Sequence, residues 1–295
     1  AGNYDVVVTD INNCSFTTSV VVTEPSALGG TTTQIDVACN GDASGSATAL
    51  PTGGTSGYTY LWCDGQTTAT ATNLAMGGCG VTITDANGCT FETSVTISEP
   101  AVLSAMVMDI QAVDCNGNAT GSIDLDVSGG VGNYSYNWSP AAPAVANPSG
   151  LAADTYAVTI TDDNGCTQTV SGIVVNEPSP ISLTFSTVDP DCALDNGSIT
   201  VAAAGGNGNY SYAWSGGADP VFNPSGLAAG TYDLVITDNL GCTLDTMITL
   251  TTPAGPVIDD LSATDVACNG DSTGTINLSF TGGQAPYTLD WPGTD

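Results

Sequence analysis

The sequence contains no lysine, no arginine and no histidine, whereas 30 of its 295 residues are aspartate or glutamate, so the formal net charge is −30. Contacts with the phosphates of nucleic acids and with anionic lipid headgroups depend on Lys and Arg. No window approaches the 18 consecutive apolar residues of a membrane-spanning helix. We therefore expect neither a nucleic-acid partner nor membrane insertion in this segment.

The missing histidines and lysines also remove the usual general bases of catalysis. A serine or cysteine nucleophile needs such a base, and only carboxylates remain here to supply one. Paired acids can hydrolyse glycosides, but the Asp and Glu residues of this chain recur at similar turns instead of forming one unique pair. The sequence predicts that the protein is not an enzyme and holds no catalytic cofactor.

The high net charge does not indicate disorder, because 41% of the residues are apolar, only 10% are charged, and the apolar residues alternate with Ser and Thr. Ten cysteines stand at regular spacing, without a CxxC motif and without a histidine to complete a zinc site. This usage is typical of disulfides formed in an oxidising compartment. We expect a folded, secreted protein with an extracellular, cell-surface location.

Two sets of cysteines repeat with one period of about 76 residues. Cys39 begins a set that recurs in steps of 76, 77 and 76, and Cys14 begins a set that recurs in steps of 75, 77 and 76. The remaining members are Cys115, Cys192 and Cys268 of the first set, and Cys89, Cys166 and Cys242 of the second. The chain is therefore a tandem array.

Each repeat contains short segments in which apolar and polar residues alternate, as in half-buried β-strands. A Gly-Gly turn precedes an aromatic run such as YSYNW, and a strand such as AVTITD leads into a tight turn. Glu-Pro pairs close the repeats, because proline cannot continue a strand ladder. We predict an all-β chain of immunoglobulin-like β-sandwich repeats with about six strands each.

These boundaries give three complete repeats and two partial ones. The complete repeats are 26–100, 101–178 and 179–253. Segment 1–25 corresponds to the last two strands of a repeat, and segment 254–295 to the first three. About ten residues, judged from 143–152, would join the end of one copy to the start of another.

The aromatic run ends at a tryptophan in every repeat, and we predict that this residue is in the sandwich core. These tryptophans are Trp62, Trp138, Trp214 and Trp291. The tyrosine that begins each run, for example Tyr58, alternates with the tryptophan and is therefore expected in the core or at its rim. The alternative is an aromatic stripe that binds surface glycans.

The succession CNGxxxGS, GG, YxYxW and LxxGTYxVxITDxNGC, followed by a Thr-rich strand that ends in EP, resembles the SprB-type repeat of giant bacterial gliding adhesins. The resemblance covers the whole chain about four times. It implies a very large cell-surface protein that is exposed as filaments and contacts a substratum. Two departures concern local turns: CALDNG lacks the usual Asn-Gly directly after Cys192, and INNC lacks the glycine before Cys14.

If the strands run alternately up and down, both cysteine-bearing turns of a repeat lie at one end of the sandwich. We therefore predict the disulfides Cys39–Cys89, Cys115–Cys166 and Cys192–Cys242. The competing pattern, Cys89–Cys115 and its equivalents, would join sites a whole domain length apart. Cys63 and Cys79 occur in one repeat only, and we predict that they bond to each other.

Aspartates gather near the cysteine-bearing turns, where a calcium site is one interpretation, since hard cations take carboxylate and carbonyl oxygens. The other is that tight turns favour Asp, Asn and Gly. The candidate calcium ligands are Asp36, Asp42, Asp85, Asp114, Asp162, Asp163, Asp189 and Asp238.

The predicted function is structural: a disulfide-stabilised fibre or stalk of an adhesin or surface filament, whose partners are neighbouring repeats or copies of itself. The alternative is a set of modules that bind carbohydrate surfaces. The incomplete segments at the two ends are complementary, so either one continuous chain or head-to-tail copies would complete a sandwich. Both routes bring Cys268 near Cys14, and we predict a bond between them.

Overall fold

The chain is an all-β protein in a computed structural model that describes residues 1–192, 194–215 and 222–291. This part contains strands β1 to β22 and no helix, so no helix in it is long and apolar enough to cross a membrane. The strand pairs whose register the structure gives are antiparallel. The last residues of the fifth predicted segment, 292–295, lie outside the described residues.

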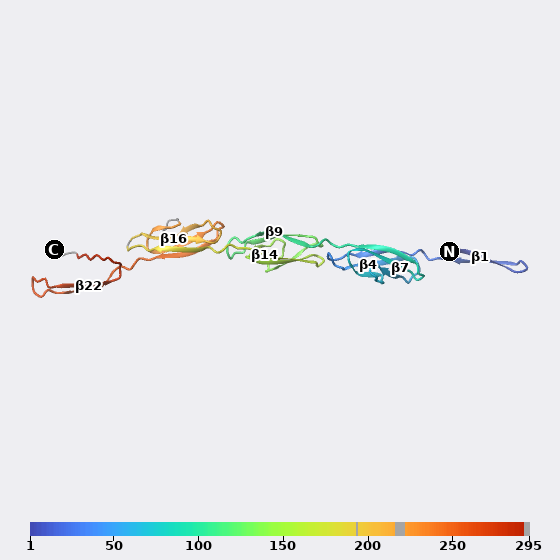
Figure 1. Cartoon of the computed structure of the whole chain (residues 1–295), viewed down its shortest axis with the longest axis horizontal. Helices are drawn as coiled ribbons and strands as arrows, with labels where there is room; N and C mark the ends of the chain where they lie inside the picture. Colours follow the sequence, from blue (N-terminus) through green and yellow to red (C-terminus); the bar gives the residue numbers. More distant parts are fainter. Residues whose placement is uncertain (193, 216–221, 292–295) are drawn as a thin grey trace. The chain divides into compact units, whose positions relative to one another are not determined.

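Each complete repeat is a sandwich of two three-stranded sheets (Figure 1), as the alternation of apolar and polar residues predicts. In the first repeat the sheets are β3-β4-β6 and β5-β7-β8. Its strands are β3 (Gly29–Ile35), β4 (Gly45–Thr52), β5 (Thr59–Trp62), β6 (Thr70–Leu74), β7 (Gly77–Thr84) and β8 (Thr90–Ile97).

The second and third repeats have the same strand order, β9-β10-β12 with β11-β13-β14 and β15-β16-β18 with β17-β19-β20. The second repeat has β9 (Ser104–Gln111), β10 (Gly121–Ser128), β11 (Ser135–Ser139), β12 (Ser149–Leu151), β13 (Asp154–Thr161) and β14 (Thr167–Val175). The third has β15 (Ser182–Val188), β16 (Gly197–Ala204), β17 (Ser211–Trp214), β18 (Ser225–Leu227), β19 (Gly230–Thr237) and β20 (Thr243–Leu250).

The direction of each strand determines which loops lie at the same end of the sandwich. β6 is antiparallel to β4, β7 is antiparallel to β5, and a short turn reverses the chain between β6 and β7. It follows that β5 and β6 run in the same direction, so the strands do not simply alternate. The loop after β3 and the turn after β7 consequently lie at opposite ends of the repeat.

Two of the predicted core tryptophans are buried. Trp62 and Trp138 are 2% and 5% exposed, and their indole N–H groups donate to backbone carbonyls of Thr68 and Val145. Trp214 is half-buried against the core of the third repeat. The prediction is wrong for Trp291, which is 53% exposed because no second sheet covers it.

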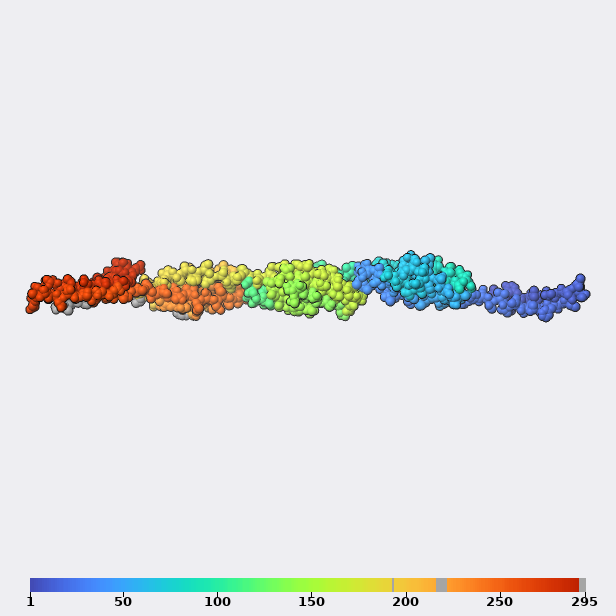
Figure 2. All heavy atoms as spheres, turned by 90° about the horizontal axis from the view of Figure 1, so that it is seen from below, coloured from blue at the N-terminus to red at the C-terminus, as the bar shows by residue number. Residues whose placement is uncertain are grey.

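The two partial segments form bare hairpins. The first consists of β1 (Gly2–Thr9) and β2 (Ser15–Val22), and the last of β21 (Val257–Thr264) and β22 (Thr275–Thr281). A third strand was predicted at the end of 254–295, but residues 287–291 form none. In Figure 2 the first hairpin, dark blue, is narrower than the complete repeat next to it, and all its strand residues are exposed.

The chain divides into two compact units that do not follow the repeat boundaries. One comprises residues 1–111 and 122–175, and the other comprises 112–121 and 176–295. The loop 112–121 belongs to the second repeat in sequence, yet it groups with the third repeat.

Cys63 and Cys79 form the disulfide that the sequence predicts within the first repeat. Cys79 stands where the other complete repeats have Tyr156 and Tyr232, which are 4% and 5% exposed. Each of those tyrosines donates its hydroxyl hydrogen to a backbone carbonyl four residues earlier. The disulfide therefore replaces a buried tyrosine anchor.

We expect Cys63→Ser/Cys79→Ser to lower the free energy of unfolding of the first repeat by about 3 kcal/mol, the chain-entropy value for a loop of this length. Hydrogen exchange resolved by repeat measures the effect, with the third repeat as the internal reference. Cys63→Ser/Cys79→Tyr restores the tyrosine and should recover part of the loss. Equal protection of the first repeat in the wild type and in Cys63→Ser/Cys79→Ser would contradict the structural role of this bond.

Candidate functional site: the joints between repeats

Two disulfides connect consecutive repeats. Cys39 bonds to Cys166 and Cys115 bonds to Cys242, and each bond joins residues 127 positions apart. In both, the loop after the first strand of one repeat meets the turn after the fifth strand of the next. We call the first element the outgoing loop, the second the incoming turn, and the place where they meet a joint.

The predicted pairs Cys39–Cys89, Cys115–Cys166 and Cys192–Cys242 are therefore wrong, and the competing pair Cys89–Cys115 is not formed either. The prediction assumed strict alternation of strand direction, and the parallel course of β5 and β6 breaks it. The two cysteines of one repeat consequently lie at opposite ends of its sandwich. Among the described residues, Cys14, Cys89, Cys192 and Cys268 are free and exposed.

The outgoing loop is held against the end of its own repeat. The side-chain amide of Asn40 donates to the carbonyl of Pro100 at 2.9 Å, and the Gly41 N–H donates to the Glu99 carboxylate at 2.8 Å. The second repeat has the same arrangement, with Asn116 and Gly117 bonded to Pro178 and Glu177. The Cys-Asn-Gly and Glu-Pro motifs thus form one clamp that fixes the outgoing cysteine.

The incoming turn is organised by one buried aspartate. Asp162, 5% exposed, accepts the N–H groups of Asn164 and Cys166 on one carboxylate oxygen and that of Val131 on the other, each at 2.9 Å. Asp85 and Asp238 make equivalent bonds in the first and third repeats. The carboxylate therefore fixes the backbone at the incoming cysteine.

A Gly-Gly turn connects this aspartate to the start of the repeat. The N–H of Gly130 donates to the carbonyl of Ala101, the first residue of the second repeat. Gly130 has a φ of +63°, and a Cβ there would lie 2.7 Å from the Asp162 carboxylate, so only glycine fits. The same bond recurs at Gly54, Gly206 and Gly283.

A direct hydrogen bond crosses each joint beside the disulfide. In the first joint the Asn164 amide donates to the carbonyl of Ala38 at 2.9 Å. In the second the donor is Asn207, which reaches the carbonyl of Asp114 at 2.8 Å. Sequence analysis singled out neither asparagine, because each is an ordinary turn residue until the neighbouring repeat is in place.

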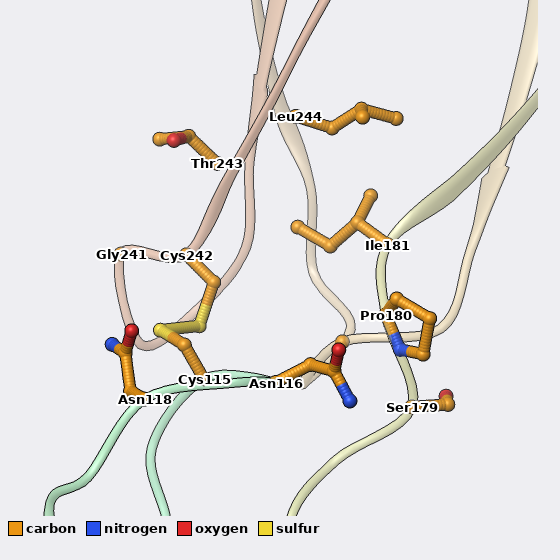
Figure 3. Close-up of a pocket in the computed structure, with 11 residues that line it drawn as sticks. Cys115, Asn116, Asn118, Ser179, Pro180, Ile181, Gly241, Cys242, Thr243 and Leu244 are labelled. Carbon is orange, nitrogen blue, oxygen red and sulfur yellow. A yellow bond between two sulfur atoms is a disulfide. The ribbon is translucent and has the colours of Figure 1, made fainter.

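Each joint also contains an open hollow of about 370 Å³. Figure 3 shows the second one, where the Cys115–Cys242 bond links the loop of Asn116 to the turn at Gly241, with Pro180 and Ile181 at its side. The surfaces at the joint are thus not closely packed throughout. The disulfide and the hydrogen bond supply the specific contacts there.

The candidate calcium ligands do not form a shared cluster of carboxylates among the described residues. No group of three or more metal-ligating acidic, Cys or His side chains occurs in the part of the chain that the structure describes. The carboxylates of Asp85, Asp162 and Asp238 are engaged by backbone N–H groups instead. The exposed candidates are separate: Asp36 and Asp189 bind backbone at Ser98 and Thr251, Asp163 binds Asn133, and Asp42 and Asp114 join no cluster.

The tyrosine at the start of each aromatic run uses its hydroxyl within its own repeat. In all four cases the hydroxyl donates to the carbonyl of the first glycine of the Gly-Gly turn. The pairs are Tyr58 with Gly53, Tyr134 with Gly129, Tyr210 with Gly205, and Tyr287 with Gly282. This supports the structural interpretation of these tyrosines over a glycan-binding stripe.

The SprB repeat family model matches residues 31–67, 109–143, 184–219 and 261–293. Four segments of the chain match the SprB repeat. Each match begins in or next to the first strand of a repeat, includes the outgoing loop and reaches the aromatic run. With the disulfides, these repeats identify an extracellular repeat region.

No curated protein sequence matches the chain. Among solved structures it is similar to Sidekick-1 immunoglobulin domains 1–5 (12% identity, 85% of this chain and 66% of that chain, TM-score 0.34). Drosophila OTK extracellular domains 3–5 give 9% identity, 76% and 92% coverage and a TM-score of 0.27. Domains 1–6 of the surface layer protein SbsC give 12% identity over 96% of this chain and 54% of that chain, with a TM-score of 0.25.

The buried aspartates make the stability of the fold depend on pH. Burial alone would raise the pKa of Asp162, but the N–H groups of Val131, Cys166, Asn164 and Gly165 outweigh it and lower the pKa below its ordinary value. A lowered pKa in the folded state stabilises the fold above the unfolded-state pKa of about 4. This stabilisation is lost as pH falls through the lower, folded-state value.

We expect Asp162→Asn to destabilise the second repeat at neutral pH, because an amide nitrogen cannot accept the Val131 N–H. The difference in unfolding free energy between wild type and variant should shrink as pH falls below about 4. Asp124→Asn, on the exposed face of β10, is the matched control for removing one charge. Chemical denaturation across pH 2 to 7 checks this, and a difference that is constant with pH would contradict the role assigned to Asp162.

Proposed function

We propose that this chain is a structural, non-catalytic region of an extracellular adhesin or surface filament, in which each joint resists extension. The observation that carries the proposal is that the disulfides connect consecutive repeats. A bond inside a sandwich protects that sandwich alone, whereas a bond across a joint adds a second covalent route from one repeat to the next. That arrangement suits a fibre under tension.

The disulfides shorten the covalent route through the chain. Between Cys39 and Cys242 the backbone has 203 residue steps, but a route through both disulfides uses only the 51 steps between Cys166 and Cys115. At about 3.5 Å per residue, full extension is limited to roughly 180 Å instead of about 700 Å. Unfolding of the second repeat under load therefore releases little length.

The SprB repeats support a place for this region in a gliding-motility adhesin at the cell surface. The 30 acidic residues without any basic residue give neighbouring repeats and neighbouring molecules the same sign of charge. Such a charge keeps filaments soluble and separate. The alternative function, a carbohydrate-binding face on each repeat, has no observation in its favour, since the candidate tyrosine hydroxyls bond within the repeat.

Single-molecule stretching of residues 1–295 between its termini tests the proposal. We expect the maximal end-to-end length between Cys39 and Cys242 to increase by several hundred ångströms when the disulfides are reduced. The backbone route of 203 residue steps then becomes available. The variant Cys39→Ser/Cys166→Ser/Cys115→Ser/Cys242→Ser should show the longer extension without reductant. The same maximal extension in oxidised and reduced wild type would refute a load-limiting role of the joints.

A further inference from the structure

The incoming turn of the second repeat contains an asparagine followed by a glycine, Asn164-Gly165. This dipeptide loses the asparagine amide readily, because glycine has no side chain to hinder the attack of its backbone nitrogen on the asparagine side chain. Both residues are exposed, so water can reach them. The Asn164 amide is also the group that donates to the Ala38 carbonyl across the first joint at 2.9 Å. A chemically labile group thus forms the hydrogen bond of this joint.

We propose that Asn164 is a deamidation site that the closed joint protects, so that its modification records an opening of the joint. In the first step the Gly165 nitrogen bonds to the side-chain carbonyl carbon of Asn164, its proton passes to the leaving nitrogen, and ammonia departs to leave a cyclic imide. In the second step water adds to the imide and breaks one of its two ring C–N bonds. The product is aspartate or isoaspartate, and the balance is one water consumed and one ammonia released.

The closed joint restrains the amide that must move for this reaction. The Asn164 side chain has to turn toward the Gly165 nitrogen, but its bond to Ala38 holds it toward the neighbouring repeat. Two other bonds restrain the turn. The Asn164 N–H donates to the Asp162 carboxylate at 2.9 Å, and the Gly165 N–H donates to the Asp162 carbonyl at 3.0 Å. These two bonds lie within the second repeat, so opening of the joint releases the amide and leaves the turn in place.

The first repeat contains a matched turn whose asparagine amide is bonded within its own repeat. Asn87 donates its backbone N–H to the Asp85 carboxylate at 2.9 Å, and Gly88 donates to the Asp85 carbonyl at 3.0 Å, as in the second repeat. The Asn87 side-chain amide, however, donates to the Thr55 hydroxyl oxygen at 2.8 Å. Opening of a joint should leave this bond unchanged. Asn87 is therefore an internal control for Asn164.

The second joint depends less on closure for the protection of its asparagine. Asn207 precedes Gly208 and donates its amide to the Asp114 carbonyl across the joint at 2.8 Å. The same amide also donates to the Asp238 carboxylate of its own repeat at 3.1 Å. This second restraint remains when the joint opens. We expect the deamidation rate of Asn207 to rise less than that of Asn164.

Deamidation of Asn164 prevents the joint from closing as before. The carboxylate of the product accepts hydrogen bonds but cannot donate one, so it sets a negative oxygen against the Ala38 carbonyl oxygen. It also adds a charge next to Asp162 and Asp163, in a chain without Lys, Arg or His to compensate it. Because the ammonia is lost, renewed formation of the disulfide does not restore the donor. The record of an opened joint is therefore permanent.

The test compares the oxidised 295-residue chain with Cys39→Ser/Cys166→Ser, in which no disulfide holds the first joint. Both proteins are incubated at mildly alkaline pH, and mass spectrometry of chymotryptic peptides measures deamidation at each Asn-Gly pair. We expect the rate at Asn164 to rise about fivefold in the variant, which is the factor that one typical hydrogen bond contributes. The rate at Asn87 in the same molecules should not change.

An equal rate at Asn164 in the two proteins would overturn the proposal, because the joint would then give no protection. An equal rise at Asn164 and Asn87 would also overturn it, since that result indicates general loosening of the chain. Thr55→Val is the reciprocal variant, because it removes the hydroxyl that holds Asn87 and leaves the first joint intact. It should accelerate deamidation about fivefold at Asn87 alone. An unchanged rate at Asn87 would contradict protection by an amide hydrogen bond in this type of turn.

Asn164→Asp mimics the product and tests its effect on the joint. The reduced variant and the reduced wild type are reoxidised in a glutathione buffer, and non-reducing peptide maps measure the Cys39–Cys166 bond. We expect the equilibrium ratio of bonded to open first joint to fall at least about fivefold, because the cross-joint hydrogen bond is lost and its acceptor is left unpaired. Equal ratios in the variant and the wild type would contradict a lasting effect of deamidation.

Asn87→Asp is the matched control for the added charge, since it changes the equivalent turn residue of the first repeat. It should leave the ratio of bonded to open first joint unchanged. A similar fall in Asn87→Asp and Asn164→Asp would show that net charge, and not the lost donor, determines closure. None of these measurements applies a force, so their failure leaves the load-limiting role of the joints to its own test.

Discussion

The connection between β5 and β6 determines how this chain is cross-linked. Because the chain passes from one sheet to the other without reversing direction, the turn after β7 lies at the opposite end from the loop after β3. Cysteines at these two places cannot reach each other within one sandwich, since a disulfide needs Cα atoms within about 7 Å. They reach the neighbouring repeat instead, with Cα–Cα distances of 5.6 Å.

The rest of each repeat holds these two ends in position. At the outgoing end of the first and second repeats, the Asn-Gly of the loop clamps the Glu-Pro that closes the repeat. At the incoming end a buried aspartate, a Gly-Gly turn and a tyrosine hydroxyl form one network with the first residue of the repeat. The recurrent motifs of the sequence are therefore mostly parts of joints. The strands between them need only an alternation of apolar and polar residues.

Much of this could be predicted from the sequence, because repetition and alternation are local signals. The period, the six strands of each complete repeat and the burial of Trp62 and Trp138 all follow from them. The disulfide pairing could not, because it depends on strand directions across two sheets. Trp291 is exposed because no second sheet covers it, and Asn164 gains its partner only when the preceding repeat is present.

An all-acidic chain must stabilise its buried charges without side-chain cations, and this chain does so with backbone N–H groups. Asp85, Asp162 and Asp238 are buried, and all three have a lowered pKa because of these bonds. Hydrogen bonds to an ionised acceptor are stronger than those between neutral groups. The backbone N–H groups therefore hold the carboxylate of the incoming turn without a side-chain cation.

The joint is a heterologous contact, since an outgoing loop always meets an incoming turn and never another loop. Contacts of this kind do not close on themselves when the repeats are related by translation, so they continue for as long as further repeats are supplied. Each complete repeat carries one outgoing and one incoming cysteine, which are the two halves of the contact. Length can then change by whole repeats without a change in the chemistry of any joint, which is the property that an extended surface filament requires.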